Sequence, residues 1–126
     1  MIAGIGIDIV EIERFKKLME RFGQRIVERI LTEREIEQFE RRQRSATFLS
    51  SRFAAKEAAS KALGKGIAAG LSFHSFEVSN DDLGKPQLQL LGAAHELAES
   101  MQVSRSLLSL SDEKHYAVAM VILETD

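Results

Sequence analysis

The 126-residue sequence has no cysteine and no tryptophan, and only one proline and one tyrosine. Without cysteine the chain has neither a disulfide framework nor a thiolate metal site, which fits a reducing compartment. Its longest apolar run, residues 117–123, is far too short to cross a membrane, and no signal peptide pattern is present. We therefore expect a cytoplasmic protein that does not bind membranes and that folds as a single domain over residues 1–126.

The whole chain also lacks a large charge of either sign, because its net charge is −2. Its halves nevertheless differ: residues 1–65 carry fourteen basic and ten acidic side chains, and residues 66–126 carry three and nine, giving +4 against −6. This asymmetry predicts a basic region in the first half that meets an acidic partner. Nucleic acid is disfavoured as that partner, since the chain as a whole is acidic and only 6% of its residues are aromatic.

Residues 52–66 are rich in alanine and lysine and predict a helix with a glycine at its C-terminal end. Small side chains fall on nearly every side of this helix, so we expect it in the interior. Glu57 and Lys61 lie one turn apart and project a carboxylate and a cation from one side. Lys65 and Gly66 follow in a flexible turn whose backbone N–H groups can approach a phosphate. The alternative for Glu57 and Lys61 is an ordinary solvated ion pair.

Residues 1–10 alternate isoleucine with glycine or aspartate, which predicts a strand. Asp8 shares one face of this strand with Gly4 and Gly6. Because that face has no other side chain near the carboxylate, another backbone or a ligand can come very close to it. The alternative role of Asp8 is to cap or end the strand.

The rest of the chain alternates between helical and strand periodicity. Helical spacing covers residues 11–22 and 25–31, and Thr32 with Glu35 forms a capping box at the start of a further helix. Strand patterns cover residues 75–79, 87–91, 107–111 and 116–123, with a helix at 92–102. We predict an α+β fold in which helices pack on a mainly antiparallel sheet, in the order β-α-α-α-β-β-α-β-β.

Two motifs, together with their separation, resemble the paired signature of the phosphopantetheinyl transferases. They are Gly6-Ile7-Asp8 near the start and Phe53-Ala54-Ala55-Lys56-Glu57-Ala58-Ala59-Ser60-Lys61. The likeness covers essentially the whole chain, including Leu83-Gly84-Lys85-Pro86 and His115-Tyr116-Ala117. Within that family the chain resembles the short, single-domain group, the holo-[acyl-carrier-protein] synthases.

The resemblance implies magnesium-dependent transfer of phosphopantetheine from coenzyme A to a serine of apo acyl carrier protein, with release of adenosine 3′,5′-bisphosphate, for fatty acid biosynthesis. It assigns Asp8 and Glu57 to the Mg²⁺ ion, which accepts one or two protein carboxylates and completes its shell with water and phosphate oxygens. It assigns Lys61, with Glu57, to catalysis, since phosphoryl transfer needs charge stabilisation and positioning. Either a metal-bound water or Glu57 takes the serine proton. Coenzyme A binding is assigned to Arg52, Lys61, Lys65 and Gly66.

Two positions depart from the family pattern. Val10 stands where larger members have a third carboxylate, so we expect a water at that coordination position. Asp112 stands where some short members have a histidine, which leaves the contact to the 3′ end of the nucleotide open, with His115 as the alternative. Strand alternation places Glu11 on the face opposite Asp8.

The family relationship also implies two kinds of protein partner: acidic acyl carrier protein, and further copies of the chain in a homotrimer with intersubunit active sites. Arg14 and Arg21 lie two turns apart on one face of the helix after the first strand, and Arg14 matches a carrier-contacting arginine of the family. We predict that both dock the carrier protein, with Arg25 as a weaker third candidate. The alternative is that these arginines only solvate their helix. A second basic cluster contains Arg41, Arg42 and Arg44.

Two other classes of function use the same features. A magnesium-dependent nucleotide pyrophosphatase would use the same acids and lysines but would attack with water and need no protein acceptor. A nucleic-acid-binding module would use the basic helices alone. The product formed from coenzyme A, magnesium and apo carrier protein separates all three.

Overall fold

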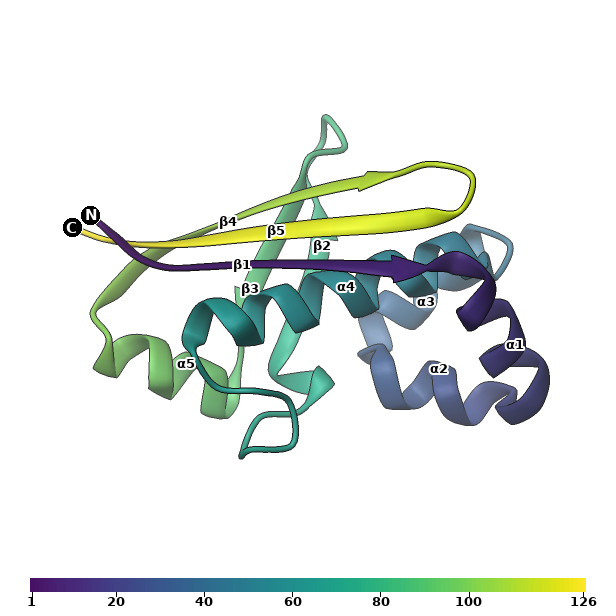
Figure 1. Cartoon of the computed structure of the whole chain (residues 1–126), viewed down its shortest axis with the longest axis horizontal. Coiled ribbons are helices and arrows are strands. Elements are labelled where there is room, and N and C mark those ends of the chain that lie inside the picture. Colours follow the sequence, from purple (N-terminus) through teal and green to yellow (C-terminus); the bar gives the residue numbers. More distant parts are fainter.

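The computed structural model describes residues 1–126 and shows an α+β fold in which helices lie against one face of an antiparallel sheet (Figure 1). The fold class and the order of elements are confirmed. The helical region between the first two strands is divided into four segments, because the backbone leaves the helical conformation at Gly23, at Leu31 and after Arg41. In chain order the elements are β1 (Ile2–Glu11), α1 (Ile12–Phe22), α2 (Gln24–Ile30), α3 (Glu33–Arg41), α4 (Ala46–Leu63), the 3-10 turn η1 (Phe73–Ser75), β2 (Phe76–Asn80), β3 (Pro86–Leu90), α5 (Gly92–Ser100), β4 (Val103–Asp112) and β5 (Tyr116–Thr125).

Three long strands form the main sheet, in the order β1-β5-β4, and all pairs are antiparallel. β1 and β5 lie side by side over their full length, so the two chain ends meet, where the N-terminal amine of Met1 donates to the Thr125 carbonyl at 2.9 Å (Figure 1). β2 and β3 form a separate hairpin. The Ser106 hydroxyl of β4 links the two sheets by donating to the Leu88 carbonyl of β3 at 3.0 Å.

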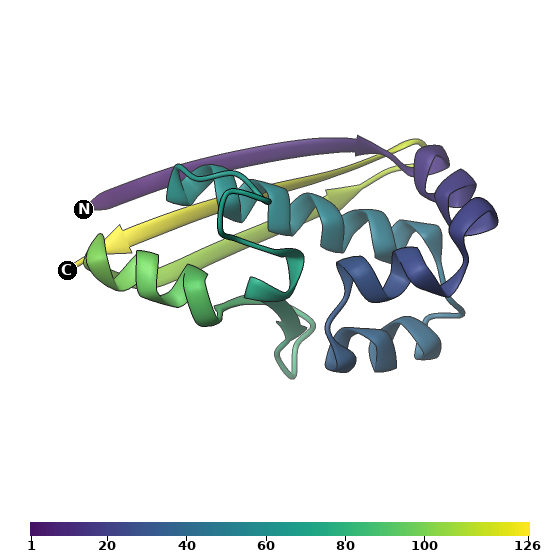
Figure 2. The same cartoon turned by 90° about the horizontal axis from the view of Figure 1, so that it is seen from below.

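Helix α4 runs along the inner face of the main sheet (Figure 2). The Ser45 hydroxyl caps its start by accepting from the Phe48 N–H at 3.2 Å, and Gly64 ends it with a φ of 77°. Most of its residues are buried, which confirms the expected interior helix. A Cβ at Gly4 or Gly6 would overlap a carbonyl oxygen of α4. These glycines therefore allow the close backbone approach that the sequence predicts, and the approaching backbone is that of α4.

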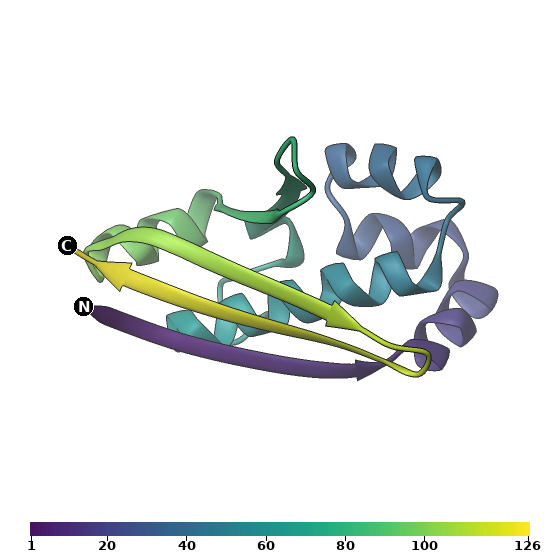
Figure 3. The same cartoon turned by 90° about the horizontal axis from the view of Figure 1, so that it is seen from above.

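The other face of the main sheet has no helix over it (Figure 3). Ile5, Ile7 and Ile9 of β1 lie on this face and are 61%, 59% and 62% exposed. Met120, which pairs with Ile7 in the register of β5, is 37% exposed. A contiguous apolar surface of this kind is typical of a protein–protein contact.

The predicted capping box is present at the start of α3. The Thr32 hydroxyl accepts from the Glu35 N–H at 3.3 Å, and Glu35 Oε1 accepts from the Thr32 N–H at 2.9 Å. Each group satisfies a backbone donor that the first helical turn leaves without a partner. None of the helices has both the length and the apolar composition needed to cross a bilayer.

Candidate active site

Asp8, Glu57 and Lys61 come together where the end of β1 lies over α4. Asp8 points to the inner face of the sheet, as the alternation with Gly4 and Gly6 predicts. Lys61 Nζ donates to Asp8 Oδ1 at 3.0 Å and to the Ile7 carbonyl at 2.9 Å. Glu57 lies one turn before Lys61 on the same helix. Two acids and a lysine from distant parts of the sequence thus share one site.

The surroundings of Glu57 change its pKa. Desolvation by partial burial raises the pKa of Glu57, and the negative charge of Asp8 raises it further, whereas Lys61 and Arg14 lower it. Asp8 Oδ2 is buried and has no hydrogen-bond partner. A buried carboxylate oxygen without a donor, next to a second acid, fits a divalent cation.

A magnesium site here would rely on Asp8 and Glu57 alone among protein side chains. No group of three or more His, Asp or Glu side chains is placed to hold a metal ion. Mg²⁺ does not require such a group, because it keeps several waters and binds phosphate oxygens of its substrate. The donor set therefore fits Mg²⁺ better than a metal that needs a complete protein cage.

The raised pKa of Glu57 has a measurable consequence for stability. Because the folded protein disfavours the charged form, Glu57 contributes stability below its ordinary pKa of 4.5, and that contribution is lost as pH rises through the higher folded-state value. We therefore expect Glu57→Gln, in chelator-treated buffer, to raise Tm by a few degrees at about pH 7 and to change it little at about pH 4. Calorimetry at both pH values checks this, and a lowered Tm at neutral pH would contradict it.

Helix α1 brings Arg14 to the same end of α4. The Arg14 guanidinium carbon lies 5.4 Å from the ring centroids of both Phe15 and Phe53, and Phe53 lies one turn before Glu57. Arg21 lies two turns further along α1, 5.1 Å from the ring of Phe22. Both arginines are exposed. The predicted docking pair thus forms a basic face on α1, and its Arg14 end adjoins the carboxylates.

Comparison with known proteins shows the family to which the chain belongs. Residues 4–121 match the family model described as the 4'-phosphopantetheinyl transferase superfamily. The chain is 56% identical over 124 residues to a holo-[acyl-carrier-protein] synthase of Vibrio cholerae, with 98% of each chain covered. The chain belongs to this superfamily. The prediction of an enzyme of the phosphopantetheinyl transferase family, based on the two motifs, is confirmed.

Solved structures of superfamily members share the whole fold. The holo-[acyl-carrier-protein] synthase of Neisseria meningitidis has a TM-score of 0.92 at 41% identity, covering 99% of this chain and 100% of that one. A holo-(acyl-carrier-protein) synthase of Bacillus anthracis, in complex with CoA (3',5'-ADP), has a TM-score of 0.83 at 43% identity, covering 100% and 99%. The α+β arrangement described above is therefore that of phosphopantetheinyl transferases.

Lys65 and Gly66 lie in the exposed turn directly after the end of α4. The Lys65 side chain extends over Gly70, which closes the loop back toward α4. Within this loop Ala68 has a φ of 82°, a left-handed conformation that costs free energy for a residue with a Cβ. The loop therefore contains a strained residue, and the assignment of Lys65 and Gly66 to coenzyme A stays a prediction.

Arg52 was also assigned to coenzyme A. Within a single chain, however, its side chain does not lie beside Asp8 and Glu57. It is 6% exposed and points about 140° away from Glu57 around α4. Its Nη2 donates to Asn80 Oδ1 at 3.1 Å and to Gln38 Oε1 at 3.4 Å, and its guanidinium lies 4.2 Å from the ring of Phe48. Burial lowers its pKa to about 10. Within one chain Arg52 thus joins α4 to α3 and β2.

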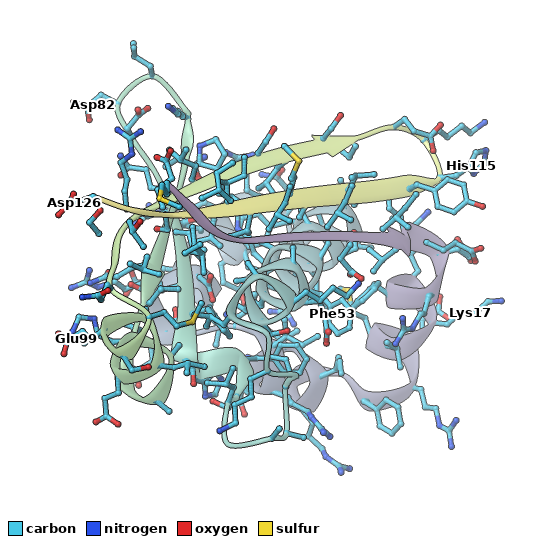
Figure 4. The ribbon with its side chains drawn as sticks, turned by 60° about the vertical axis from the view of Figure 1, so that its left-hand side comes forward. Lys17, Phe53, Asp82, Glu99, His115 and Asp126 are labelled. Carbon is cyan, nitrogen blue, oxygen red and sulfur yellow. The ribbon has the colours of Figure 1, made fainter.

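The tip of the β4–β5 hairpin carries His115 (Figure 4). The His115 carbonyl accepts from the Ile12 N–H at 2.9 Å, which ties the hairpin to the start of α1. A cavity of about 590 Å³ at this junction is lined by Glu11, Lys16 and His115 among others. Asp112 does not line it, so of the two residues considered for the nucleotide's 3′ end only His115 faces this space.

Sequence reasoning missed a buried ion pair next to the site. Lys56 and Glu35 are both fully buried, with 2.6 Å between Nζ and Oε1. The sequence predicts only a capping role for Glu35 and no role for Lys56. The signal was available, because a lysine inside an alanine-rich interior helix needs a buried acceptor. Its partner could not be identified from spacing, since the two residues lie on different helices.

Proposed function

We propose that the protein transfers the phosphopantetheine group of coenzyme A to a serine of an acyl carrier protein for fatty acid biosynthesis, in a magnesium-dependent reaction that releases adenosine 3′,5′-bisphosphate. The observation that carries this proposal is the convergence of Asp8, Glu57 and Lys61, with one buried Asp8 oxygen lacking a hydrogen-bond donor. The similar B. anthracis protein, which binds CoA, and the V. cholerae holo-[acyl-carrier-protein] synthase support the choice of substrates. The proposed location is a reducing cytoplasm, which a chain without cysteine tolerates.

In this proposal Asp8 and Glu57 hold the Mg²⁺ ion, whose chemistry is to neutralise charge on the pyrophosphate. The carrier serine attacks the phosphorus that bears the pantetheine arm, and the bond from that phosphorus to the oxygen of adenosine bisphosphate breaks. Lys61 has three N–H donors, of which two bond to Asp8 and to the Ile7 carbonyl, so the third is available to a phosphate oxygen. Either a water or Glu57 takes the serine proton.

The surroundings add positive charge to the same place. Arg14 lies close enough to lower the pKa of Glu57. Lys65 and Gly66 in the turn after α4 are proposed to contact phosphate through a cation and a backbone N–H. Arg52 remains a proposed coenzyme A ligand, although within one chain its side chain is buried and bonds to Gln38 and Asn80.

The test is the mass of the carrier protein. Purified protein is incubated with coenzyme A, Mg²⁺ and apo carrier protein, and the carrier is weighed by mass spectrometry. We expect a gain of one phosphopantetheine, no gain with a carrier whose acceptor serine is replaced by alanine, and no gain after chelation. Phosphopantetheine and adenosine bisphosphate released without carrier would instead identify a pyrophosphatase, and no product at all would contradict both activities.

We also propose that the enzyme is a homotrimer with active sites between subunits. The face of the main sheet that no helix covers (Figure 3) supports this proposal. Ile5, Ile7 and Ile9 of β1 are exposed on that face. The opposite face of β5 is already covered within the chain, since its residues Ala119 and Val121 are fully buried. Contact with neighbouring subunits would remove this apolar face from water.

Sedimentation tests the assembly. We expect wild-type protein to sediment as a trimer and Ile7→Glu to sediment as a monomer, because a charge at the centre of the apolar face opposes its burial. Leu83→Glu is the matched control, since Leu83 is also apolar and 96% exposed but lies at the β2–β3 turn. It should remain trimeric. An active wild-type monomer at assay concentration would rule out the proposed intersubunit site.

A further inference from the structure

The buried pair of Lys56 and Glu35 takes no direct part in the proposed chemistry. Both side chains are fully buried, and Lys56 Nζ donates to Glu35 Oε1 at 2.6 Å and to the Ile30 carbonyl at 2.7 Å. Buried ion pairs contribute little net stability compared with apolar residues of the same volume, because desolvation offsets the attraction. A function other than stabilisation therefore has to be considered for this pair.

Glu35 is held rigidly by elements other than α4. Its Oε1 accepts from the Thr32 N–H at 2.9 Å, within the capping box of α3. Its Oε2 accepts from the Val78 N–H of β2 at 2.7 Å. Both carboxylate oxygens are thus fixed by backbone donors, and Lys56 bonds to an acceptor whose position is set by α3 and β2.

The large apolar side chains of α4 lie toward its start, where Phe48 packs on Phe39 and Phe53 packs on Phe15. Around Lys56 and Glu57 the apolar residues of the helix are alanines, whose methyl groups limit rotation less than large side chains do. The contact with β1 is made at the backbone, where Gly4 and Gly6 lie against the carbonyls of Ala62 and Ala58. This contact sets the distance between β1 and α4.

The polar contacts of α4 add a directional constraint. Arg52 lies one turn before Lys56 on the same side of the helix and bonds to Gln38 and Asn80 of the neighbouring elements. Glu57 directly follows Lys56, so their side chains are about 100° apart around the axis. Any rotation of α4 that moved Lys56 away from its carboxylate would move Glu57 by the same angle.

We propose that Lys56 is a positioning residue, whose bond to Glu35 fixes the rotation of α4 and so directs Glu57 and Lys61 toward Asp8. A reacting constellation must be held within about 0.5 Å and 10–20° of its productive geometry, and a directional bond such as that of Lys56 contributes to this precision. Lys56 then holds α4 in position, and the adjacent Glu57 faces the substrate. The inference rests on the proposed function, because it takes Glu57 and Lys61 as the reacting residues.

The test removes the pair without leaving a buried charge. The double variant Glu35→Gln with Lys56→Met replaces both ions with neutral side chains of similar volume and is assayed at a temperature at which circular dichroism shows it fully folded. We expect kcat to fall by about 10- to 100-fold. Affinity for Mn²⁺, measured by electron paramagnetic resonance, should fall as well. The KM for carrier protein should stay unchanged, since the proposed docking residues Arg14 and Arg21 lie on α1 and not on α4.

Two further variants separate positioning from stability. Val78→Ala truncates a fully buried side chain of β2 but keeps the N–H that bonds to Glu35, so it should lower Tm and leave kcat unchanged. Glu35→Asp keeps both charges and withdraws the carboxylate by one CH₂ group. This variant replaces the double variant as the test of the pair if the double variant does not fold. Its kcat should lie between those of wild type and the double variant.

The outcomes distinguish this inference from the proposed function. Folded pair variants that keep the kcat and the Mn²⁺ affinity of wild type would overturn the positioning role. An equal loss of kcat in Val78→Ala would do the same, because stability alone would then explain it. A wild-type protein that neither transfers phosphopantetheine nor binds Mn²⁺ would overturn the proposed function, and the inference with it.

Discussion

Asp8→Asn and Glu57→Gln are each expected to lower the rate of phosphopantetheine transfer by about 1,000-fold or more, through loss of a metal-binding charge. Each substitution keeps the shape of the side chain, so the fold should remain intact. For Glu57→Gln the stability at neutral pH should even increase, because the folded protein disfavours the charged carboxylate. Loss of activity together with unchanged or higher Tm would be hard to explain by damage to the fold.

The measurement is kcat at saturating coenzyme A and carrier, together with calorimetric titration of Mg²⁺. Glu13→Gln is a matched control, since it makes the same chemical change at an exposed acid of α1 whose contact is Lys16 at 3.8 Å. It should bind Mg²⁺ and turn over normally. Near-normal turnover of Asp8→Asn or Glu57→Gln at ordinary Mg²⁺ concentration would remove that residue from the metal site.

Reversing both docking charges, Arg14→Glu with Arg21→Glu, is expected to raise the KM for carrier protein by about 100-fold and to make it less sensitive to salt. Affinity for coenzyme A should stay nearly unchanged. The placement of Arg14 beside Phe53 and the carboxylates adds a further expectation for the single variants. Arg14→Glu should lower kcat as well as raise KM, whereas Arg21→Glu should act on KM alone.

Steady-state kinetics at several salt concentrations check this docking prediction. The double reversal Arg41→Glu with Arg42→Glu is the matched control, because it introduces the same charge change at the end of α3. It should leave the carrier KM close to that of wild type. If the effects are exchanged between the two double variants, the carrier docks on the cluster at residues 41–44 instead of on α1.

Several local features could be predicted because they depend on residues close together in the sequence. The Thr32–Glu35 capping box and the left-handed Gly64 at the end of α4 are both present as expected. The alternation in β1 likewise placed Asp8 on the face of Gly4 and Gly6. Each of these follows from the geometry of a single helix or strand.

Only part of the proposed site could be predicted from the sequence. Asp8, Glu57 and Lys61 were selected from their types, their spacing and the family resemblance, and the structure places them together. Arg52 was selected in the same way, yet its side chain leaves α4 on the side of α3 and β2. Sequence spacing gives the angle between two side chains of a helix, but it does not say which neighbour each one meets.

The sequence by itself determined the secondary structure, the interior position of α4 and the types of residue available for chemistry, because periodicity, capping and small side chains act over one element. Only the tertiary structure decided that an orphaned Asp8 oxygen lies near Glu57, that Lys56 meets Glu35, and that the isoleucines of β1 face outward. These are contacts between elements far apart in the chain. They depend on how helices and strands pack, and packing is set by the combined shape and polarity of all the elements at once.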